Sequence, residues 1–292
     1  MKHQSGFVNI IGKPNVGKST LMNALLGENL SIVTNKAQTT RHRIKGILNN
    51  ENYQIIFSDT PGMLKPVYKL HEKMMDMVNE TLTDADVVIY LIEIKEKNID
   101  EELLTKLQFI KAPVLLVMNK VDEVDQEFIE LQTEHWQQLL KPKEIIPISA
   151  LHKFYLDVLL KKILENLPEN EAYFDKNDEL SDRDMRFFAS EIIREKILLF
   201  YQKEIPYSVE VKIQSYKENV DIDVIKAFIY TARESQKAII LGHGGAAIKK
   251  VGTEARKKLE EMLGKKVFLE LTVKVIEDWR NDEQSLKRFG YE

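Results

Sequence analysis

Short apolar runs separated by amphipathic stretches fill the first 168 residues. Six of the runs have the length and composition of strands: FVNIIG, RIKGILN, YQIIFSDT, DVVIYLIE, APVLLVMNK and EIIPIS. Helical periodicity occupies most of the intervals, and this alternation predicts an α/β fold, a mainly parallel sheet with helices on both faces. Because only NNEN separates the second run from the third, these two predict an antiparallel hairpin at the sheet edge.

The pattern changes at LPENEAYFDKNDELSD, which contains proline and acidic residues and has no periodicity. We interpret residues 169–182 as a linker between two domains. Beyond it the order is a helix over about 183–203, two strands, a helix, a glycine-rich turn, a helix over about 245–262, a strand and a short helix. The sequence therefore predicts an α/β domain over residues 1–168 and an α+β domain over 183–292, a division that 292 residues allow.

Composition narrows the class of protein. The chain is 43% hydrophobic and 30% charged, and no apolar run approaches the roughly 20 residues that span a bilayer. The opening MKHQSGFVNII has no signal-peptide pattern, so we expect a cytoplasmic protein. The absence of cysteine excludes disulfides, thiol catalysis and cysteine-based zinc sites, and the six scattered histidines lack metal-site spacing.

Charge is unevenly distributed along the chain. Residues 233–266 carry nine Lys or Arg against four Glu, a net of +5, whereas the rest of the chain carries −9. Basic charge thus surrounds the glycine-rich turn GHGG, where a polyanion is expected to bind.

A phosphate-binding motif stands near the N-terminus. IIGKPNVGKSTLMNALLG matches G-x-x-x-x-G-K-[ST] between an apolar strand and a helix, the context that this motif requires. Its glycines let backbone N–H groups and the helix N-terminus face the phosphates. Lys18 supplies positive charge to the β and γ phosphates, and the Ser19 hydroxyl ligates Mg²⁺. The predicted phosphate-binding residues are Gly12, Lys13, Pro14, Asn15, Val16, Gly17, Lys18, Ser19 and Thr20.

The sequence NKVD decides which base is bound. It follows the apolar strand PVLLVM, which places it at the carboxyl edge of the sheet, where ligands bind. The Asp122 carboxylate can accept hydrogen bonds from two guanine donors, whereas adenine would leave it unpaired at a cost of several kcal/mol. The predicted guanine-binding residues are Asn119, Lys120, Asp122 and, after the last strand, Ser149, Ala150 and Leu151.

These motifs, together with DTPG after the hairpin, resemble those of translation-factor-class GTPases. The resemblance implies a second switch at Asp59, Thr60, Pro61, Gly62 and Met63, with Asp59 holding Mg²⁺ through water. The first switch lies in NKAQTTRHR at Thr39 and Thr40. By similarity to GTPases with TTR here, we choose Thr40 as the Mg²⁺ ligand, beside Ser19 and Asp59.

Met63 stands where many GTPases have a catalytic glutamine, and a thioether cannot orient the attacking water. The chain resembles GTPases with a hydrophobic residue in this place, some of which use a K⁺ ion held partly by a phosphate-loop asparagine. Asn15 occupies the matching position. The alternative is that Asn15 only fixes the loop through hydrogen bonds.

The second glycine loop joins two helical patterns and has the G-x-x-G form of a K-homology (KH) domain. The following helix has an apolar stripe and a mostly basic opposite face, so an RNA backbone can approach the loop closely. A C-terminal helix cap and a merely solvated basic face are the alternatives. His243 stands where related proteins usually carry Lys. The predicted RNA-binding residues are Gly242, His243, Gly244, Gly245, Lys249, Lys250 and Arg256.

Taken in order, these motifs and the ending WRNDEQSLKRFGY resemble the Era family of bacterial ribosome-assembly GTPases, with a P-loop GTPase domain and a C-terminal type II KH domain, over essentially the whole chain. The resemblance implies slow hydrolysis of GTP to GDP with Mg²⁺. It also implies binding to the single-stranded 3′ end of 16S rRNA, a role in maturation of the 30S subunit, a monomer, and peripheral association with the inner face of the cell membrane.

Two other classes of protein fit the sequence less well. A metabolic or tRNA-modifying GTPase needs a further substrate domain, for which no segment remains. An RNA-binding protein with a decayed nucleotide site is disfavoured by the intact Lys18, Ser19, Asp59, Asn119 and Asp122.

Overall fold

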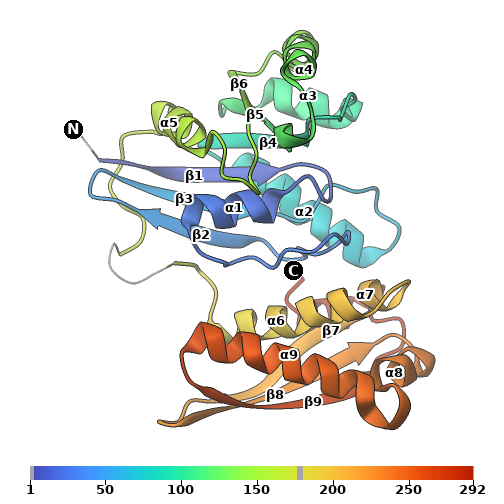
Figure 1. Ribbon diagram of the computed structural model, residues 1–292. Coiled ribbons are helices and arrows are strands. Elements are labelled where there is room, and N and C mark those ends of the chain that lie inside the picture. Colours follow the sequence, from blue (N-terminus) through green and yellow to red (C-terminus); the bar gives the residue numbers. More distant parts are fainter. Residues whose placement is uncertain (1–2, 176–179, 292) are drawn as a thin grey trace. The chain divides into compact units, whose positions relative to one another are not determined.

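The computed structural model describes residues 3–175 and 180–291, and the chain forms two compact units (Figure 1). The first unit takes in Met1–Ser31, Thr40–Leu64 and Met74–Asp182, and the second takes in Ile32–Thr39, Lys65–Lys73 and Arg183–Glu292. These units do not follow the contiguous bounds that the sequence suggested, because two short segments from the first 168 residues group with the second unit. The domain bounds therefore stay a prediction.

The first unit is built on a six-stranded sheet in the order β2-β3-β1-β4-β5-β6. Its strands are β1 (Gln4–Ile11), β2 (Ile44–Asn49), β3 (Tyr53–Asp59), β4 (Val87–Glu93), β5 (Val114–Asn119) and β6 (Glu144–Pro147). All neighbouring pairs are parallel except β2 with β3, which forms an antiparallel hairpin at the edge. Each of the six apolar runs is thus a strand, and the predicted α/β fold with its edge hairpin is confirmed.

Helices follow most strands of this sheet (Figure 1). They are α1 (Lys18–Leu26), α2 (Lys69–Thr83), α3 (Glu101–Phe109), α4 (Gln126–Leu140) and α5 (Leu156–Asn166), with a single 3₁₀ turn, η1 (Val121–Glu123). Strands β4 and β5 are apolar up to their last residues, Glu93 and Asn119, because both of their faces are covered. One cluster packs them against α3 and α4, with Trp136 of α4 fully buried.

The expected linker is structured where it is described. Residues 176–179 lie outside the described residues, but the flanking parts belong to the first unit and pack on its sheet. The fully buried Gln54 accepts hydrogen bonds from the N–H groups of Tyr173 and Phe174, and Ser181 pairs with Gly46 of the edge strand β2. The described parts of this segment lack periodicity because single backbone groups and side chains attach them to the sheet, not because they have no contacts with it.

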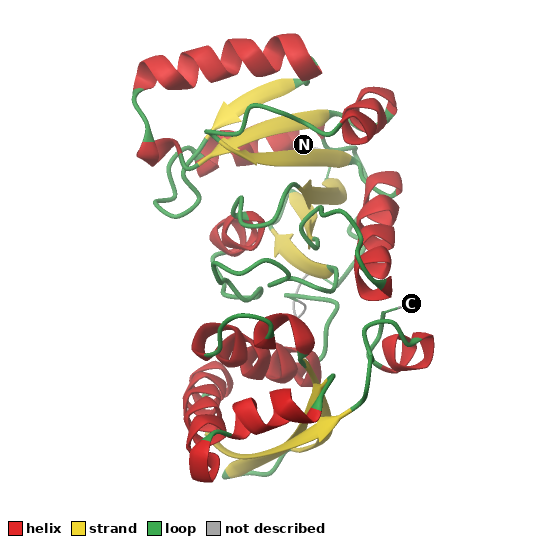
Figure 2. Ribbon diagram, turned by 90° about the vertical axis from the view of Figure 1, so that its right-hand side faces the viewer, coloured by secondary structure: helices red, strands yellow, loops and turns green. Residues whose placement is uncertain are grey.

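The second unit has a three-stranded sheet in the order β7-β8-β9, with most of its helices gathered on one face (Figure 2). Strand β8 pairs antiparallel with β7 and parallel with β9. Its elements are α6 (Met185–Phe200), α7 (Ile205–Ser208), β7 (Glu210–Lys217), β8 (Ile222–Thr231), α8 (Glu234–Leu241), η2 (His243–Gly245), α9 (Ala246–Leu263), β9 (Lys266–Val275) and α10 (Glu283–Arg288). The predicted order is confirmed, with one unpredicted short helix, α7.

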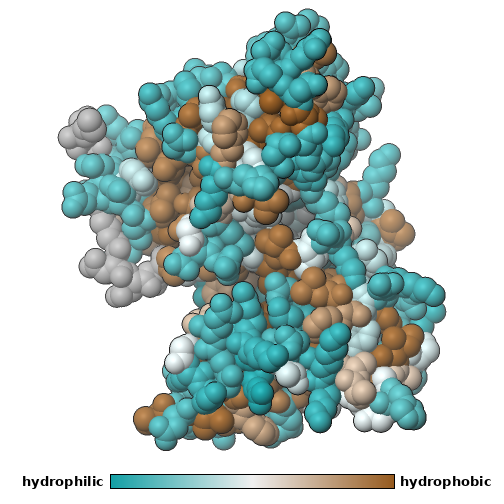
Figure 3. All heavy atoms as spheres, viewed as in Figure 1, coloured by the Kyte–Doolittle hydropathy of each residue, from teal (hydrophilic) through white to brown (hydrophobic). Residues whose placement is uncertain are grey.

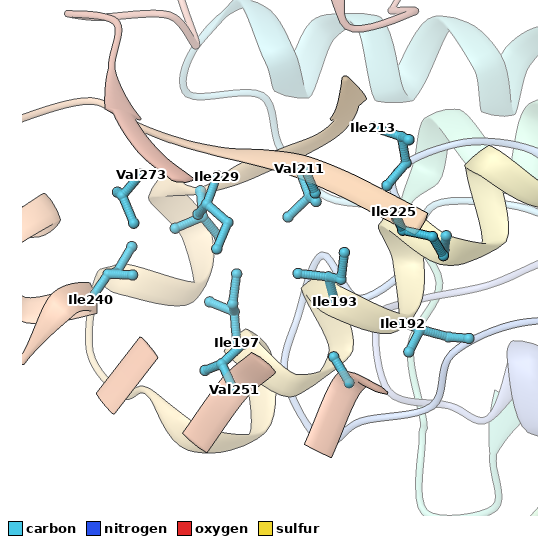
Figure 4. Packing of buried hydrophobic residues seen from close by; sticks show 14 of the residues in the cluster. Ile192, Ile193, Ile197, Val211, Ile213, Ile225, Ile229, Ile240, Val251 and Val273 are labelled. Carbon is cyan, nitrogen blue, oxygen red and sulfur yellow. The ribbon is translucent and has the colours of Figure 1, made fainter. Parts of the chain in front are cut away.

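Aliphatic residues from every layer of this unit meet in one core (Figure 4). Ile193 and Ile197 of α6 face Ile225 and Ile229 of β8, and all four are fully buried. Val251 contributes the α9 side of the same cluster. At roughly 1.5–3 kcal/mol per buried aliphatic side chain, this core stabilises a unit whose helices would be marginal alone.

Candidate nucleotide site and RNA surface

The phosphate loop connects β1 to α1 through backbone conformations that glycine favours. Gly12 has φ +156°, and a Cβ there would lie 2.2 Å from the Leu91 carbonyl oxygen. Gly17 has φ +104°, and a Cβ there would lie 2.3 Å from the Asn119 side-chain nitrogen. The loop is therefore closed in by its own protein at both glycines, and its N–H groups lead into the first turn of α1.

Lys18 is buried at the base of this loop. Its ammonium group donates hydrogen bonds to the carbonyl oxygens of Gly12 (3.0 Å) and Lys13 (2.8 Å). Burial lowers the pKa of Lys18 to about 8, against the opposing attraction of the Asp59 carboxylate. A phosphate group bound here would be a negatively charged partner for the buried ammonium group of Lys18.

Three side-chain oxygen atoms, of Ser19, Thr40 and Asp59, lie together. The Ser19 hydroxyl donates to Asp59 Oδ2 at 2.7 Å, the Thr40 hydroxyl donates to the same oxygen at 3.2 Å, and the two hydroxyl oxygens are 3.0 Å apart. Asp59 is fully buried, which raises the pKa of its carboxyl, while the Ser19 hydrogen bond opposes that shift. Hydroxyl and carboxylate oxygens suit Mg²⁺, so the donor set fits the predicted ion.

The structure also separates the two candidate threonines. Thr40 is buried beside Ser19 and Asp59, whereas the Thr39 hydroxyl donates to the Lys36 carbonyl oxygen at 2.6 Å. Thr40 alone of the two therefore joins the oxygen cluster that the Mg²⁺ assignment requires.

The second switch begins directly against the phosphate loop. The Met63 N–H donates to the Gly12 carbonyl oxygen at 3.0 Å, and a Cβ on Gly62 would lie 2.7 Å from Pro14 Cα. The Met63 side chain packs against the apolar cluster of the first unit. Thr60 is held separately, since its hydroxyl donates to the Ile10 carbonyl oxygen.

Asn119 ties the guanine motifs to the phosphate loop. Its side-chain amide donates to the Val16 carbonyl oxygen at 2.8 Å and accepts from the Ala150 N–H at 2.9 Å. Asn119, Ala150 and Val16 are all buried. This bridging role escaped the sequence analysis, because no spacing shows that three distant motifs share one amide.

Asp122 is the accessible acid of the guanine motifs. A hydrogen bond from Ser149 contributes most to lowering the pKa of its carboxyl, and His152 lies 3.7 Å away. Lys120 adopts a left-handed conformation at φ +66° and pairs with Glu93 at 2.8 Å. The Asp122 carboxylate is therefore favoured in its ionised form, which accepts hydrogen bonds, while the Leu151 side chain points largely to solvent.

Two other phosphate-loop residues take distinct positions. Asn15 is exposed and has a left-handed backbone conformation at φ +66°. Lys13 forms an ion pair of 2.6 Å with Glu96, a residue in the loop after β4. No motif marks Glu96, so the sequence alone could not have found it.

The second glycine loop differs in its surroundings. Gly242, Gly244 and Gly245 have φ values of +70°, +56° and +78°. A Cβ on Gly242 would lie 2.6 Å from Ala247 Cβ, but a Cβ on Gly244 or Gly245 would meet nothing within 4 Å. The loop therefore presents open backbone at the start of α9, and His243 is exposed beside it.

Helix α9 carries a buried stripe and a basic outer face, as predicted. Val251, Ala255 and Leu259 are fully buried, while the three predicted RNA-binding side chains, Lys249, Lys250 and Arg256, are exposed. The surface along α9 is hydrophilic (Figure 3). This arrangement favours an anionic chain lying across the helix N-terminus.

Two negative findings apply to residues 3–175 and 180–291. No cluster of three His, Cys, Asp or Glu side chains in them could hold a metal ion. None of their helices combines the length and the apolar character that crossing a membrane requires.

Fold and site together define a P-loop GTPase domain followed by a KH domain. Residues 7–120 match the family model described as 50S ribosome-binding GTPase, and residues 204–280 match the KH domain. The GTPase Era of Alkaliphilus metalliredigens is 44% identical over 100% of both chains, and that of Staphylococcus haemolyticus is 42% identical over 99% of this chain and 98% of the relative. The chain belongs to the Era family and is a GTPase.

Solved structures agree with this assignment. A crystal structure of Era in complex with MgGDPNP and nucleotides 1506–1542 of 16S ribosomal RNA is 41% identical, covers 99% of each chain and has a TM-score of 0.93. Aquifex aeolicus Era bound to GDP·AlF4⁻ is 40% identical over 99% of each chain, with the same TM-score. The predicted pairing of a GTPase fold with a KH fold is thus confirmed along the chain.

Proposed function

We propose that this protein binds GTP with Mg²⁺, hydrolyses it slowly, and binds the single-stranded 3′ end of 16S rRNA during maturation of the 30S subunit. The observation that carries the proposal is the presence, in one chain, of the Ser19, Thr40 and Asp59 oxygen cluster and of an open glycine loop on a basic helix. The Era complex with MgGDPNP and 16S rRNA, 41% identical, supports it.

In the nucleotide site, the loop N–H groups and Lys18 hold the β and γ phosphates. Ser19 and Thr40 bind Mg²⁺ directly, and Asp59 binds it through water; the bound ion neutralises charge on the phosphates. Buried Asp59 keeps both hydroxyls oriented through its hydrogen bonds to them.

The attacking water is not oriented by residue 63, because Met63 has no polar group and packs against the apolar cluster. Asn15, which lies exposed on the phosphate loop, would hold a K⁺ ion in part, and that ion would supply positive charge beside the phosphates. This is the function that we assign to Asn15, rather than loop fixation alone.

In the second unit, the glycine loop holds the RNA backbone, and Lys249, Lys250 and Arg256 neutralise its phosphates. KH domains clamp about four nucleotides in this way. Log–log plots of affinity against salt should have a slope of about −0.7 per phosphate neutralised, so roughly −2 to −4. Duplex RNA of the same sequence should compete poorly, since its base edges are paired.

The remaining assignments extend the same proposal. The protein acts as a cytoplasmic monomer that associates peripherally with the inner face of the membrane, and its domains cover 1–168 and 183–292 with 169–182 between them. These statements rest on the family's properties and on the change of sequence pattern at 169–182.

Nucleotide selectivity tests the guanine assignment. Asp122→Asn should lower GTP affinity by roughly 100-fold or more, since an amide cannot accept from both guanine donors, and should favour xanthine nucleotides. Equilibrium binding of GTP, ATP and xanthosine triphosphate measures this directly. Tight ATP binding by the wild-type protein would contradict the assignment.

A further inference from the structure

An exposed aromatic ring lies beside the second glycine loop. Phe200 is the last residue of α6 and is 36% exposed, and the Lys250 ammonium of α9 lies 4.5 Å from its ring centroid. The next residue, Tyr201, donates its hydroxyl hydrogen to the Ile240 carbonyl oxygen at 2.6 Å.

These contacts place the end of α6 near the loop. Ile240 lies two residues before Gly242, and Lys250 lies five residues after Gly245, about one and a half turns into α9. Phe200 thus contacts the helix that follows the glycine loop, and its neighbour Tyr201 contacts the helix that precedes it. The Lys250 charge, already expected to meet phosphate, sits against this ring.

An aromatic ring beside a cation can bind one unpaired nucleotide, because the ring stacks on the base and the cation pairs with the phosphate. Bases stack on aromatic side chains without regard to sequence, and a neighbouring cation adds attraction to the strand. Core packing does not require the exposed part of this ring, because the cluster of the second unit is formed by other residues.

We propose that Phe200 and Lys250 form a stacking position for one base of the same RNA strand, outside the four nucleotides held at the glycine loop. The inference rests on the proposed RNA binding by this unit. Its consequence is a dependence on RNA length: a strand long enough to reach Phe200 gains affinity that a four-nucleotide strand lacks.

Substitution of the ring tests the position. Phe200→Leu keeps an apolar side chain but removes the stacking face, so it should weaken a ten-nucleotide single-stranded RNA by roughly 5- to 100-fold and leave a four-nucleotide RNA unchanged. Phe268→Leu is the matched control, since Phe268 is also an exposed phenylalanine of this unit but lies on β9. It should bind both RNAs as the wild-type protein does.

Fluorescence gives a second measurement that a packing role would not produce. Both natural tryptophans, Trp136 and Trp279, are fully buried, so Phe200→Trp adds an exposed reporter. Stacking should quench its emission with the ten-nucleotide RNA and not with the four-nucleotide RNA.

The outcomes separate the two proposals. Equal loss of affinity for both RNA lengths in Phe200→Leu, or no quenching in Phe200→Trp while the ten-nucleotide RNA binds, overturns the stacking position and leaves the proposed function intact. A wild-type protein that binds neither RNA overturns both.

Discussion

The two glycine loops use glycine for different physical reasons. In the phosphate loop, a Cβ on Gly12 or Gly17 would collide with the protein itself at 2.2 and 2.3 Å. In the second loop, Gly244 and Gly245 face open space. The phosphate loop is enclosed by its own protein at Gly12 and Gly17, whereas Gly244 and Gly245 of the second loop leave open space for a partner outside the chain.

The difference predicts which substitutions stay local. A side chain in the phosphate loop disturbs the contacts that join the motifs of the first unit. A side chain at Gly244 disturbs only what approaches from solvent, apart from a modest cost of its left-handed conformation.

The largest effect is expected at Gly17. Gly17→Ala combines φ +104° with a clash against Asn119, so it should weaken GTP binding by roughly 1000-fold and destabilise the protein by about 1–3 kcal/mol. Gly27→Ala is the control at the other end of α1, with φ +76° but open space around it. Calorimetric titration with GTP and thermal unfolding measure both. Near-normal GTP affinity in Gly17→Ala would show that Asn119 can move aside.

A smaller and more selective effect is expected in the second loop. Replacing His243 and Gly244 together by Asp should weaken single-stranded RNA binding by roughly 100-fold, because two carboxylates would face the backbone. GTP hydrolysis and the melting temperature should stay near the wild-type values. The same two positions changed to Asn keep the shape without the charge and should retain much of the affinity. If the double-Asp variant binds RNA normally, the basic face of α9 is merely solvated.

Protonation of Lys18 gives an effect of about tenfold. Below pH 8 the Lys18 ammonium group is already protonated in the free protein, so GTP affinity should not depend on pH. Between pH 8 and 9, Lys18 must take up a proton when GTP binds. The affinity should therefore fall with rising pH, approaching tenfold per pH unit. Lys18→Arg, which stays protonated, should bind more weakly but without this decline. An affinity that stays level up to pH 9 contradicts the lowered pKa.

The smallest effect concerns the monovalent cation. Hydrolysis should be faster in KCl than in NaCl at equal ionic strength, and Asn15→Ala should remove the difference. A single ion forms no directed hydrogen bonds, so its rate enhancement should be smaller than the roughly 10³- to 10⁵-fold enhancement by an arginine finger. Equal rates in both salts would leave Asn15 a structural role only.

The sequence predicted features that depend on local pattern. Apolar runs identified all six strands of the first sheet, and NNEN identified the hairpin, because strand periodicity and turn residues are short-range signals. The resemblance favoured Thr40 over Thr39 as the Mg²⁺ ligand, and Thr40 is the one that lies beside Ser19 and Asp59; its role as a ligand stays a prediction.

What the sequence could not supply depends on distant contacts. Asn119 bridging Val16 and Ala150, Glu96 paired with Lys13, and Gln54 binding the linker all join residues far apart in the chain. Such partners have no common spacing, and each is a single polar side chain without a periodic pattern.

The linker beside β2 has a consequence for how the protein avoids self-association. The edge strand donates from its Ile47 N–H to the Leu180 carbonyl oxygen, and the Ser181 hydroxyl donates to the Lys45 carbonyl oxygen. An edge strand whose outward backbone N–H and C=O groups are already hydrogen-bonded cannot pair with a strand of another chain. A first unit cut after residue 168 would leave those groups unpaired and should recruit further copies edge to edge, so the segment 180–182 protects the sheet as well as leading to the next helix.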